Sequence, residues 1–440
     1  MARLDNNGPQ GLERNIGAVS TDGFATAPPP RRAADPVTDW ADSGIMPLTG
    51  QPSGPPLIPP GHAATIARRI TDRLAVATAA GPRPVRIDGA RLLSERAAFT
   101  GHHRRGAVSA GGACRLLPTA DGWAAVSCAR PDDPALLGAL VAAVLPDDPW
   151  PLVAAWLADH TGAELVDRAT PLGVAAGPVA PAEAPPPRPG PARPVADLLV
   201  VDFSALWAGP LCAQLLGSAG ARVVKVETPT RPDGARRGNP DFYRLLHAGH
   251  RSVVLDPTTP DGRQALTRLV AAADIVVEAS RPRALAGFGL AAEAAVEDGT
   301  VWVSITAHGR RSDRVGFGDD VAAASGLVAR DADGAPVFCG DALADPLTGL
   351  YAAELAMTAP TGGLGILFDV SMSAVVSATL CGADAGPSTA ARRTASGWVV
   401  DSEHGPRPVA LPCGRPVTGQ APTAGQHTDE VLRELGITTP

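Results

Sequence analysis

The sequence predicts an α/β protein built around a parallel β-sheet. Short apolar runs rich in β-branched residues, typical of buried strands, alternate with helical patterns in the second half of the chain. The first apolar run, residues 196–204, is followed by a helical pattern over 208–220 and by a second apolar run over 221–227. A strand, a helix and a strand in so short a stretch form a βαβ unit, so the two strands should lie parallel in one sheet.

The individual elements follow from the same two patterns. In the first helix, the apolar residues Leu211, Leu215 and Leu216 recur at helical spacing, and Gly220 ends the pattern. This alternation of strands and helices is what a doubly covered parallel sheet requires. It continues with a strand over 251–256, a helix over 262–273 and strands over 274–280 and 301–307.

A proline-dense stretch divides the chain into two blocks. Residues 177–195 contain GPVAPAEAPPPRPGPARP, a composition typical of a semi-rigid spacer. The spacer separates an N-terminal block, 36–176, from a C-terminal block, 196–440. We expect it to lie on the surface without core contacts and to tolerate cutting. Residues 1–35 are polar and proline-rich and should be disordered.

The two blocks also share a pattern that predicts an internal repeat. Ser43-Gly44 in the first block and Ser325-Gly326 in the second each begin a similar stretch. Asp88 follows Gly44 by 44 positions, and Asp369 follows Gly326 by 43 positions, each ahead of a helical pattern. A glycine turn, an aspartate and a helix at matched spacing favour a duplication over chance.

Composition and charge restrict the function. The formal net charge of −7 gives no electrostatic footprint for nucleic acid or for an anionic membrane. No apolar stretch reaches the roughly 20 residues of a membrane span, and the first ten residues lack the order of a signal peptide. The six cysteines form no CxxC pair and the histidines no HExxH spacing, so we expect neither a disulfide scaffold nor a metal site. These features together predict a reduced, cytoplasmic location.

Asp345 is the strongest catalytic candidate. It precedes Pro346 and an apolar helical pattern, which predicts that Asp345 caps a helix and that the proline occupies the first helical position. A capping role alone is one interpretation. The other is a nucleophile, because a carboxylate at a helix N-terminus should stay ionised in a positive local potential that also stabilises an acyl-transfer transition state.

Two further segments are candidates for binding phosphate groups. The loop SALWAGP, 204–210, leads from a strand into a helix, a natural place for a phosphate, although a tight turn explains it equally well. Because it lacks GxGxxG, a dinucleotide site is weakly supported. Arginines gather between Arg231 and Arg251; the loop up to Arg237 fits a solvated surface, and Arg251, directly before a strand, is the better phosphate ligand. His308 fits a loop position better than a proton carrier.

Together these segments resemble the class III, CaiB/BaiF-type, CoA-transferase family. VADLLVVDFSALWAGPLCAQLLGSAGARVVKVETP is similar to the family's opening βαβ unit, and HAGHRSVVLDPTTPDGRQAL to its KRS segment. ADIVVEASRPRALAGFGL resembles the ENFRPG segment, and APTAGQHTDEVLRELG the GEHT ending. GDALADPLTGLYAA resembles the stretch that holds the family's catalytic aspartate, which falls on Asp345.

The resemblance implies a fold and a reaction. The fold is a Rossmann-like large domain with a parallel sheet and a smaller α+β domain. In the reaction, Asp345 moves CoA from an acyl-CoA to a carboxylic acid through a mixed anhydride and an aspartyl-CoA thioester, with no cofactor besides CoA and no metal. A homodimer is also implied. The implied CoA contacts are Trp207, Ala208, Arg251, Leu255, Ala279, Ser280 and Arg281.

The N-terminal block resembles the second half of the same family. DWADSGIMPLTGQPSGPPL is similar to its SG-x-M-x-LTG turn, and CRLLPTADGWAAVSC to the DGW strand of its small domain. The chain is therefore expected to be rearranged, with a degenerate family-type C-terminal half placed before the catalytic N-terminal half. The first copy has Ala63, Ala64 and Thr65 at the place of the aspartate, which predicts one active site per chain and a mainly structural first block.

Two other functions stay open. An α-methylacyl-CoA racemase needs an acid/base pair, and that branch carries a histidine upstream of the aspartate; here the corresponding segment, 316–326, contains none. The second is a catalytically inactive CoA-binding or scaffold paralogue, because several implied CoA contacts depart from the family. Ala279-Ser280 replaces Asn-Phe, His250 replaces lysine, and Trp207 stands where some members have glutamine.

Overall fold

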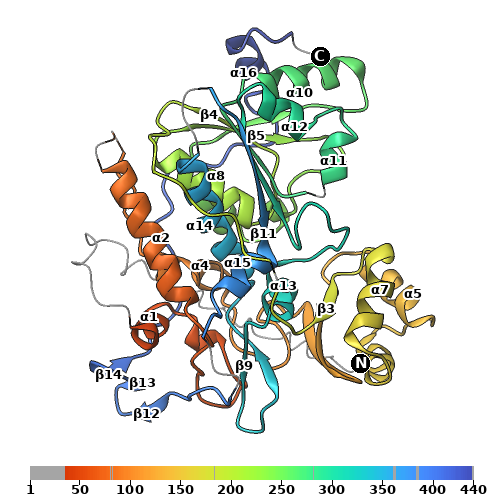
Figure 1. The fold of residues 1–440 in the computed structure, drawn as a ribbon, viewed down its shortest axis with the longest axis vertical. Coiled ribbons are helices and arrows are strands. Elements are labelled where there is room, and N and C mark those ends of the chain that lie inside the picture. The colour runs from red at the N-terminus through yellow and green to blue at the C-terminus, as the bar shows by residue number, and fades with distance from the viewer. Residues whose placement is uncertain are drawn as a thin grey trace, which may run out of the picture.

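A six-stranded parallel sheet forms the centre of the C-terminal block (Figure 1). The computed structural model describes residues 35–79, 81, 83–182, 184–280, 282–359, 363–382 and 386–438. The predicted disordered tail lies outside them, apart from Asp35. The predicted α/β class is confirmed. The strands lie in the order β11 (Ile366–Ser371), β8 (Val301–Thr306), β7 (Ile275–Glu278), β4 (Leu199–Asp202), β5 (Arg222–Glu227) and β6 (Arg251–Val254).

Helices cover both faces of this sheet, which explains why its strands are almost continuously apolar. In β4, Val200 faces one core, and Leu199 and Val201 face the other. The first core lies under α8 (Ala208–Ser218) and α14 (Ala344–Met357). On the second face lie α10 (Pro260–Ala271), α11 (Pro282–Ala286), α12 (Ala292–Glu297) and α16 (Thr428–Glu434), which gather at the upper right of Figure 1.

The first part of the N-terminal block completes the core of the C-terminal block. Trp40, Ile70 and Leu74 are buried in the same apolar cluster as Leu211 and Leu350, and the helix that carries Ile70 lies along α14 (Figure 1). The elements of this part are α1 (Pro36–Asp42), η1 (Met46–Leu48), α2 (Ala63–Thr78), α3 (Gly89–Leu92) and α4 (Glu95–Thr100).

The rest of the N-terminal block is a small α+β unit with a core of its own. Leu137, Val153 and Leu165 are buried at its centre. Its three antiparallel strands are β1 (Cys114–Thr119), β2 (Gly122–Ser127) and β3 (Ala176–Pro178), and its helices are α5 (Asp133–Val141), α6 (Trp150–Ala158) and α7 (Gly162–Leu172). It contacts the C-terminal block through α13 (Gly318–Ala324).

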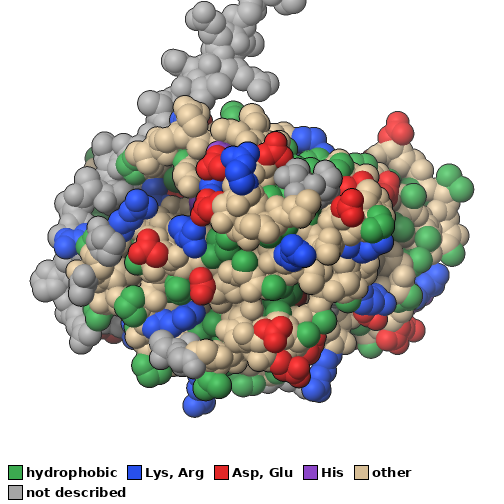
Figure 2. Space-filling model, turned by 90° about the horizontal axis from the view of Figure 1, so that it is seen from above, with side chains coloured by type: hydrophobic (Ala, Val, Ile, Leu, Met, Phe, Trp, Pro, Cys, Tyr) green, Lys and Arg blue, Asp and Glu red, His purple; other side chains and the backbone are tan. Residues whose placement is uncertain are grey.

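Shorter elements complete the C-terminal block. They are η2 (Gly234–Arg237), α9 (Pro240–His247), β9 (Val328–Arg330), β10 (Pro336–Phe338), α15 (Met372–Ala378), β12 (Arg392–Thr394), β13 (Gly397–Ser402) and β14 (Gly405–Pro408). No helix among the described residues is long and apolar enough to span a membrane. Seen from above, acidic and basic side chains are interspersed over the surface (Figure 2).

The proline-dense spacer makes hydrogen bonds to the C-terminal block, and its tolerance to cutting stays a prediction. The backbone N–H of Arg193 donates to the carbonyl of Met357 at 2.7 Å, at the end of α14. The hydroxyl of Tyr351, also on α14, donates to the carbonyl of Pro187. Proline lacks an N–H but keeps its carbonyl, so a proline-rich segment still bonds along a helix by accepting.

The two Ser-Gly turns have a common geometry. Helix α1 ends at Ser43 and is followed by Gly44 at φ 77°, and α13 ends at Ser325 and is followed by Gly326 at φ 93°. In both, a later serine hydroxyl donates to the carbonyl of the turn serine: Ser94 at 2.8 Å in the first, and Ser377 at 3.3 Å in the second. This is the geometry that a repeat requires, and the repeat itself stays a prediction.

Candidate active site around Asp345

Asp345 is not the helix cap that the sequence predicts. Helix α14 begins one residue earlier, at Ala344, and Leu343 occupies the cap position without a side-chain bond. The chain enters the helix through a tight turn in which Ala342 has φ 48° and its carbonyl accepts from the N–H of Asp345 at 2.9 Å. The Asp345 carboxylate therefore does not cap its own helix.

The carboxylate of Asp345 lies at the start of a neighbouring helix. The backbone N–H of Ala208, the first residue of α8, lies close enough to lower the pKa of this carboxyl. Two glycines make room for this arrangement. A Cβ atom on Gly349 would lie 2.6 Å from the carbonyl of Ala208, and one on Gly318 would lie 2.1 Å from a carboxylate oxygen of Asp345. The small residues that surround Asp345 thus allow α8 and α13 to approach it closely.

Three further carboxylates surround Asp345. Asp319 and Asp320 begin α13, and Asp341 lies four residues before Asp345. Burial raises the pKa of Asp345 to about 7, with contributions from the charges of Asp319 and Asp341, while the Arg96 guanidinium opposes this rise. Burial likewise raises the pKa of Asp320, to about 8. Burial therefore opposes the ionisation that the sequence analysis expects for Asp345.

Two basic residues of the N-terminal block reach these carboxylates. Arg96 on α4 forms a two-pronged ion pair with Asp341, with Nε 2.9 Å from Oδ2. Nδ1 of His102 lies 3.1 Å from the same oxygen. The Arg96 guanidinium also stacks over the ring of Trp207, 5.5 Å from its centroid. No local pattern in the sequence indicates either residue, because only the folded chain brings α4 to the start of α14.

The implied CoA contacts divide into two groups, of which the first lies beside Asp345. From β4 the chain adds β5 and β6 on one side of the sheet, and then β7, β8 and β11 on the other. The boundary between β4 and β7 is thus the point at which the strand order reverses, and ligands of open α/β sheets bind at such a point. Trp207 and Ala208 follow β4, and Ala279 and Ser280 follow β7. A Cβ on Gly209 would lie 3.4 Å from Cβ of Ala279, so the two loops are adjacent.

Polar atoms at this point are buried without a protein partner. Nε1 of Trp207 and Oγ of Ser280 have none among the described residues. A buried donor without a partner is unfavourable by about 1–3 kcal/mol unless water or a ligand satisfies it. Of the sequence-predicted contacts, these two positions therefore fit a polar ligand best.

A buried network fixes the loop between β4 and α8. The chain's single lysine, Lys225, donates to the carbonyl of Ser204 at 2.6 Å and pairs with Asp233 at 3.0 Å. Asp233 in turn accepts from the N–H of Leu206 at 3.0 Å. Leu206 has φ 70°, a strained conformation for a non-glycine residue, and these bonds hold it in place.

The second group of implied contacts lies away from Asp345. Arg251 forms an ion pair with Glu434 of α16, and the side chain of Leu255 is buried in the core on the far face of the sheet. Arg281 lies outside the described residues.

Burial lowers the pKa of His308, in the loop after β8, to about 4, so its imidazole is neutral near pH 7.

The arginines of the predicted cluster point to different partners. Arg236 pairs with Glu227, whereas Arg231 and Arg237 are exposed on the surface. Arg244 pairs with Asp241 on its own helix. The predicted solvated loop therefore fits Arg231 and Arg237, and the structure does not bring this cluster to Asp345.

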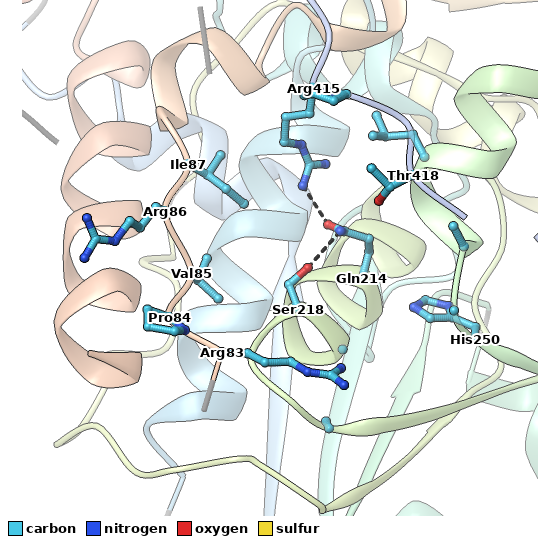
Figure 3. A pocket seen from close by; sticks show the side chains of 16 residues that line it. Arg83, Pro84, Val85, Arg86, Ile87, Gln214, Ser218, His250, Arg415 and Thr418 are labelled. Carbon is cyan, nitrogen blue, oxygen red and sulfur yellow. Dashed lines mark hydrogen bonds between the residues drawn. The ribbon is translucent and has the colours of Figure 1, made fainter. Parts of the chain in front are cut away.

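A cavity of about 530 Å³ lies between the two blocks at the other end of α8 (Figure 3). Arg83 and Val85 line one wall, and Gln214, Ser218 and His250 line the other. Three of its polar side chains bond one another: Gln214 accepts from Arg415 at 2.8 Å and donates to Ser218 at 2.9 Å. Asp345 does not line this cavity. The cavity is therefore separate from the candidate active site.

The C-terminal block contains the segment that matches a known family. Residues 195–398, just under half of the chain, match the model of CoA-transferase family III. The succinyl-CoA–D-citramalate CoA-transferase of Chloroflexus aurantiacus is 33% identical over 183 residues, 38% of this chain and 46% of that protein. The succinate–glutarate CoA-transferase of Agrobacterium fabrum is 31% identical over 211 residues, 42% of this chain and 53% of that protein.

A solved CaiB/BaiF family protein from Brucella suis is 30% identical in sequence, with a TM-score of 0.39 over 43% of this chain and 56% of that chain. The chain thus spans about half the length of the curated relatives it matches. The matched segment includes β4, α8, the loop after β7 and Asp345. In these comparisons the C-terminal block of this chain is similar to CoA-transferase family III.

Proposed function

We propose that this protein is a CoA-transferase that moves CoA from an acyl-CoA thioester to a carboxylic acid, with Asp345 as nucleophile. The observation that carries the proposal is the position of Asp345 on the first turn of α14, next to Gly349, against which α8 begins, and beside the loops that follow β4 and β7. The curated relatives named above are CoA-transferases that use succinyl-CoA or succinate.

The proposed reaction starts with attack of the Asp345 carboxylate on the thioester carbonyl. The C–S bond breaks, CoA leaves as a thiolate, and a mixed anhydride forms. The thiolate then attacks the aspartyl carbonyl, releases the donor carboxylate and leaves an aspartyl-CoA thioester. The acceptor carboxylate attacks this thioester, giving a second anhydride, and the returning thiolate forms the new acyl-CoA and restores Asp345. Covalent catalysis divides one difficult exchange into these smaller steps.

The surrounding residues have roles that fit these steps. The N–H of Ala208 points to the reacting carboxylate, where it would stabilise the oxyanion formed when the thiolate attacks the aspartyl carbonyl. The indole N–H of Trp207 and the hydroxyl of Ser280 are free to bond CoA. Arg251 stays a proposed phosphate ligand, and to act as one it would have to leave its ion pair with Glu434.

Trapping of the covalent intermediate tests the proposal. After incubation with succinyl-CoA, hydroxylamine should convert the aspartyl-CoA thioester to a hydroxamate, which peptide mass spectrometry would locate at Asp345. Asp345→Asn should give no hydroxamate and lower exchange by several orders of magnitude, since an amide is not a nucleophile for this reaction. A hydroxamate on another carboxylate, or normal exchange in the variant, would refute the assignment.

The same experiment separates the two alternatives. A racemase would give no hydroxamate but would exchange the α-proton of a 2-methylacyl-CoA with deuterated water; His102, which bonds Asp341, is the histidine that the fold brings into this region. An inactive CoA-binding paralogue would give neither product while still binding CoA in calorimetry.

A further inference from the structure

Arg96 belongs to α4 of the N-terminal block, and α4 is fixed against the C-terminal block at several points. The buried side chain of Glu95 pairs with Arg415. Asn239, which caps α9, donates from Nδ2 to the carbonyl of Phe99 at 2.8 Å, and the Phe99 ring lies 6.1 Å from the ring of Phe242. A short helix held at both ends presents its side chains with little freedom, so the position of Arg96 is determined in advance.

The ionisable groups around Asp345 are mostly acidic. The titratable groups that face it are Asp319 and Asp320 on α13 and Asp341 in the preceding loop, together with Arg96 on α4. His102 contacts this group only through Asp341. Arg96 is the one permanent positive charge among them. Without it, ionised Asp345 would face like charges alone, and a carboxylate substrate would meet them as well.

We propose that Arg96 is a positioning residue of the Asp345 site, so that the N-terminal block supplies part of the active site. Its guanidinium is fixed on one side by the fork to Asp341 and on another by the face of Trp207. From there it serves as the counter-charge for the Asp345 carboxylate. This inference rests on the proposed function and adds to it a residue outside the segment that matches the family.

The direction of pKa changes follows from these contacts. Arg96 opposes the rise in the pKa of Asp345, and Asp341 contributes to that rise. Removal of Arg96 should therefore raise this pKa further, and neutralisation of Asp341 should lower it. If Arg96 and Asp341 only supported the fold, their substitution would not shift the pKa of Asp345 in opposite directions.

The test is the pH dependence of exchange in the full chain. In the wild type, exchange should rise with pH through about 7, as Asp345 ionises. Arg96→Gln should move this rising limb to higher pH, and a movement of one pH unit would lower exchange at pH 6 about tenfold. Arg96→Lys should restore most of the original profile, and Asp341→Asn should move the limb to lower pH.

Arg73→Gln is the matched control. Arg73 on α2 pairs with the buried Glu354 of α14, so this substitution also removes an ion pair between the two blocks. It should lower thermal stability while leaving the pH profile unchanged. Equal displacement of the limb in Arg73→Gln and Arg96→Gln, or no displacement in Arg96→Gln, would overturn the proposal.

A second readout does not depend on exchange. A diazoacetamide esterifies protonated carboxyl groups, so the pH at which labelling of Asp345 falls by half, followed by peptide mass spectrometry, reports its protonation. If the protein exchanges no CoA, the proposed function fails, but the labelling curve of Arg96→Gln must still move to higher pH. Identical labelling curves for the wild type and Arg96→Gln would reject the role of Arg96.

Discussion

Helices α14 and α2 pack against each other and begin with the same residue type, yet only one carries the candidate nucleophile. The two helices differ at their second and sixth residues. These are Asp345 and Gly349 in α14, and Ala64 and Arg68 in α2. In α14 the sixth position has no side chain, and the start of α8 packs against it.

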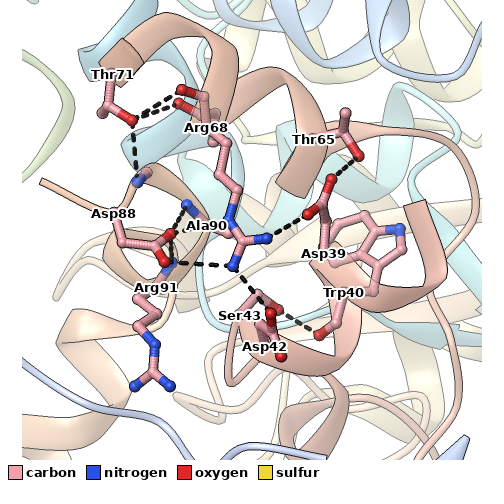
Figure 4. A network of polar contacts seen from close by, with 12 residues as sticks. Asp39, Trp40, Asp42, Ser43, Thr65, Arg68, Thr71, Asp88, Ala90 and Arg91 are labelled. Carbon is pink, nitrogen blue, oxygen red and sulfur yellow. Dashed lines mark hydrogen bonds and ion pairs between the residues drawn. The ribbon is translucent and has the colours of Figure 1, made fainter. Parts of the chain in front are cut away.

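In α2 the arrangement of charge is reversed (Figure 4). The second position has no charge, and Arg68 at the sixth position pairs with Asp39, Asp42 and Asp88. Asp88 is itself the cap of the helix that docks there, so its carboxylate bonds its own helix and Arg68. Both helices therefore receive the start of another helix, but only α14 has a carboxylate at its second position, whereas the carboxylates beside α2 pair with Arg68.

Separation of the two blocks should have the largest effect. Helix α2 and α14 are buried in one apolar cluster, and removal of residues 1–190 would expose that surface. We expect residues 196–440 to be insoluble or inactive alone and to recover exchange when residues 1–190 are co-expressed. A monodisperse, active 196–440 fragment in gel filtration and exchange assays would show that α14 needs no partner helix.

Substitution of the glycine should have an intermediate effect. In Gly349→Ala the added Cβ would lie 2.6 Å from the Ala208 carbonyl and 3.0 Å from Cβ of Leu211. We expect displacement of α8, a loss of about 1–3 kcal/mol in unfolding free energy and slower exchange at saturating substrate. Arg68→Ala, at the matching position of α2, should lower stability and leave exchange by the remaining folded protein unchanged. Equal loss of exchange in both variants would remove the distinction between the helices.

The charge of Asp345 should also change the stability of the fold, in a way that depends on pH. Its folded pKa of about 7 lies above the unfolded value of about 3.9. The folded state thus binds the extra proton between these values, and ionisation disfavours folding as the pH rises. Asp345→Asn lacks this penalty. Its stability should exceed that of the wild type above pH 7, and the difference should vanish as the pH falls to about 4. A difference independent of pH in denaturant titrations would contradict the raised pKa.

Local patterns in the sequence predicted most of the fold but only part of the site. The strands and helices from β4 to β8 follow from periodicity, because each is long enough to show it. The cap assigned to Asp345 was wrong because Ala342 adopts a positive φ that no residue preference indicates. Arg96 and His102 were missed because their relation to Asp341 exists only after two blocks distant in sequence pack together.

The buried position of Lys225 has a consequence for a protein that handles reactive thioesters. Acyl-CoA compounds acylate free amines without a catalyst, and lysine side chains are the usual targets. Lys225 is the only lysine in the sequence, its side chain is 1% exposed, and its ammonium group is held by Ser204 and Asp233. The surface therefore offers no lysine amine to a bound or released acyl donor.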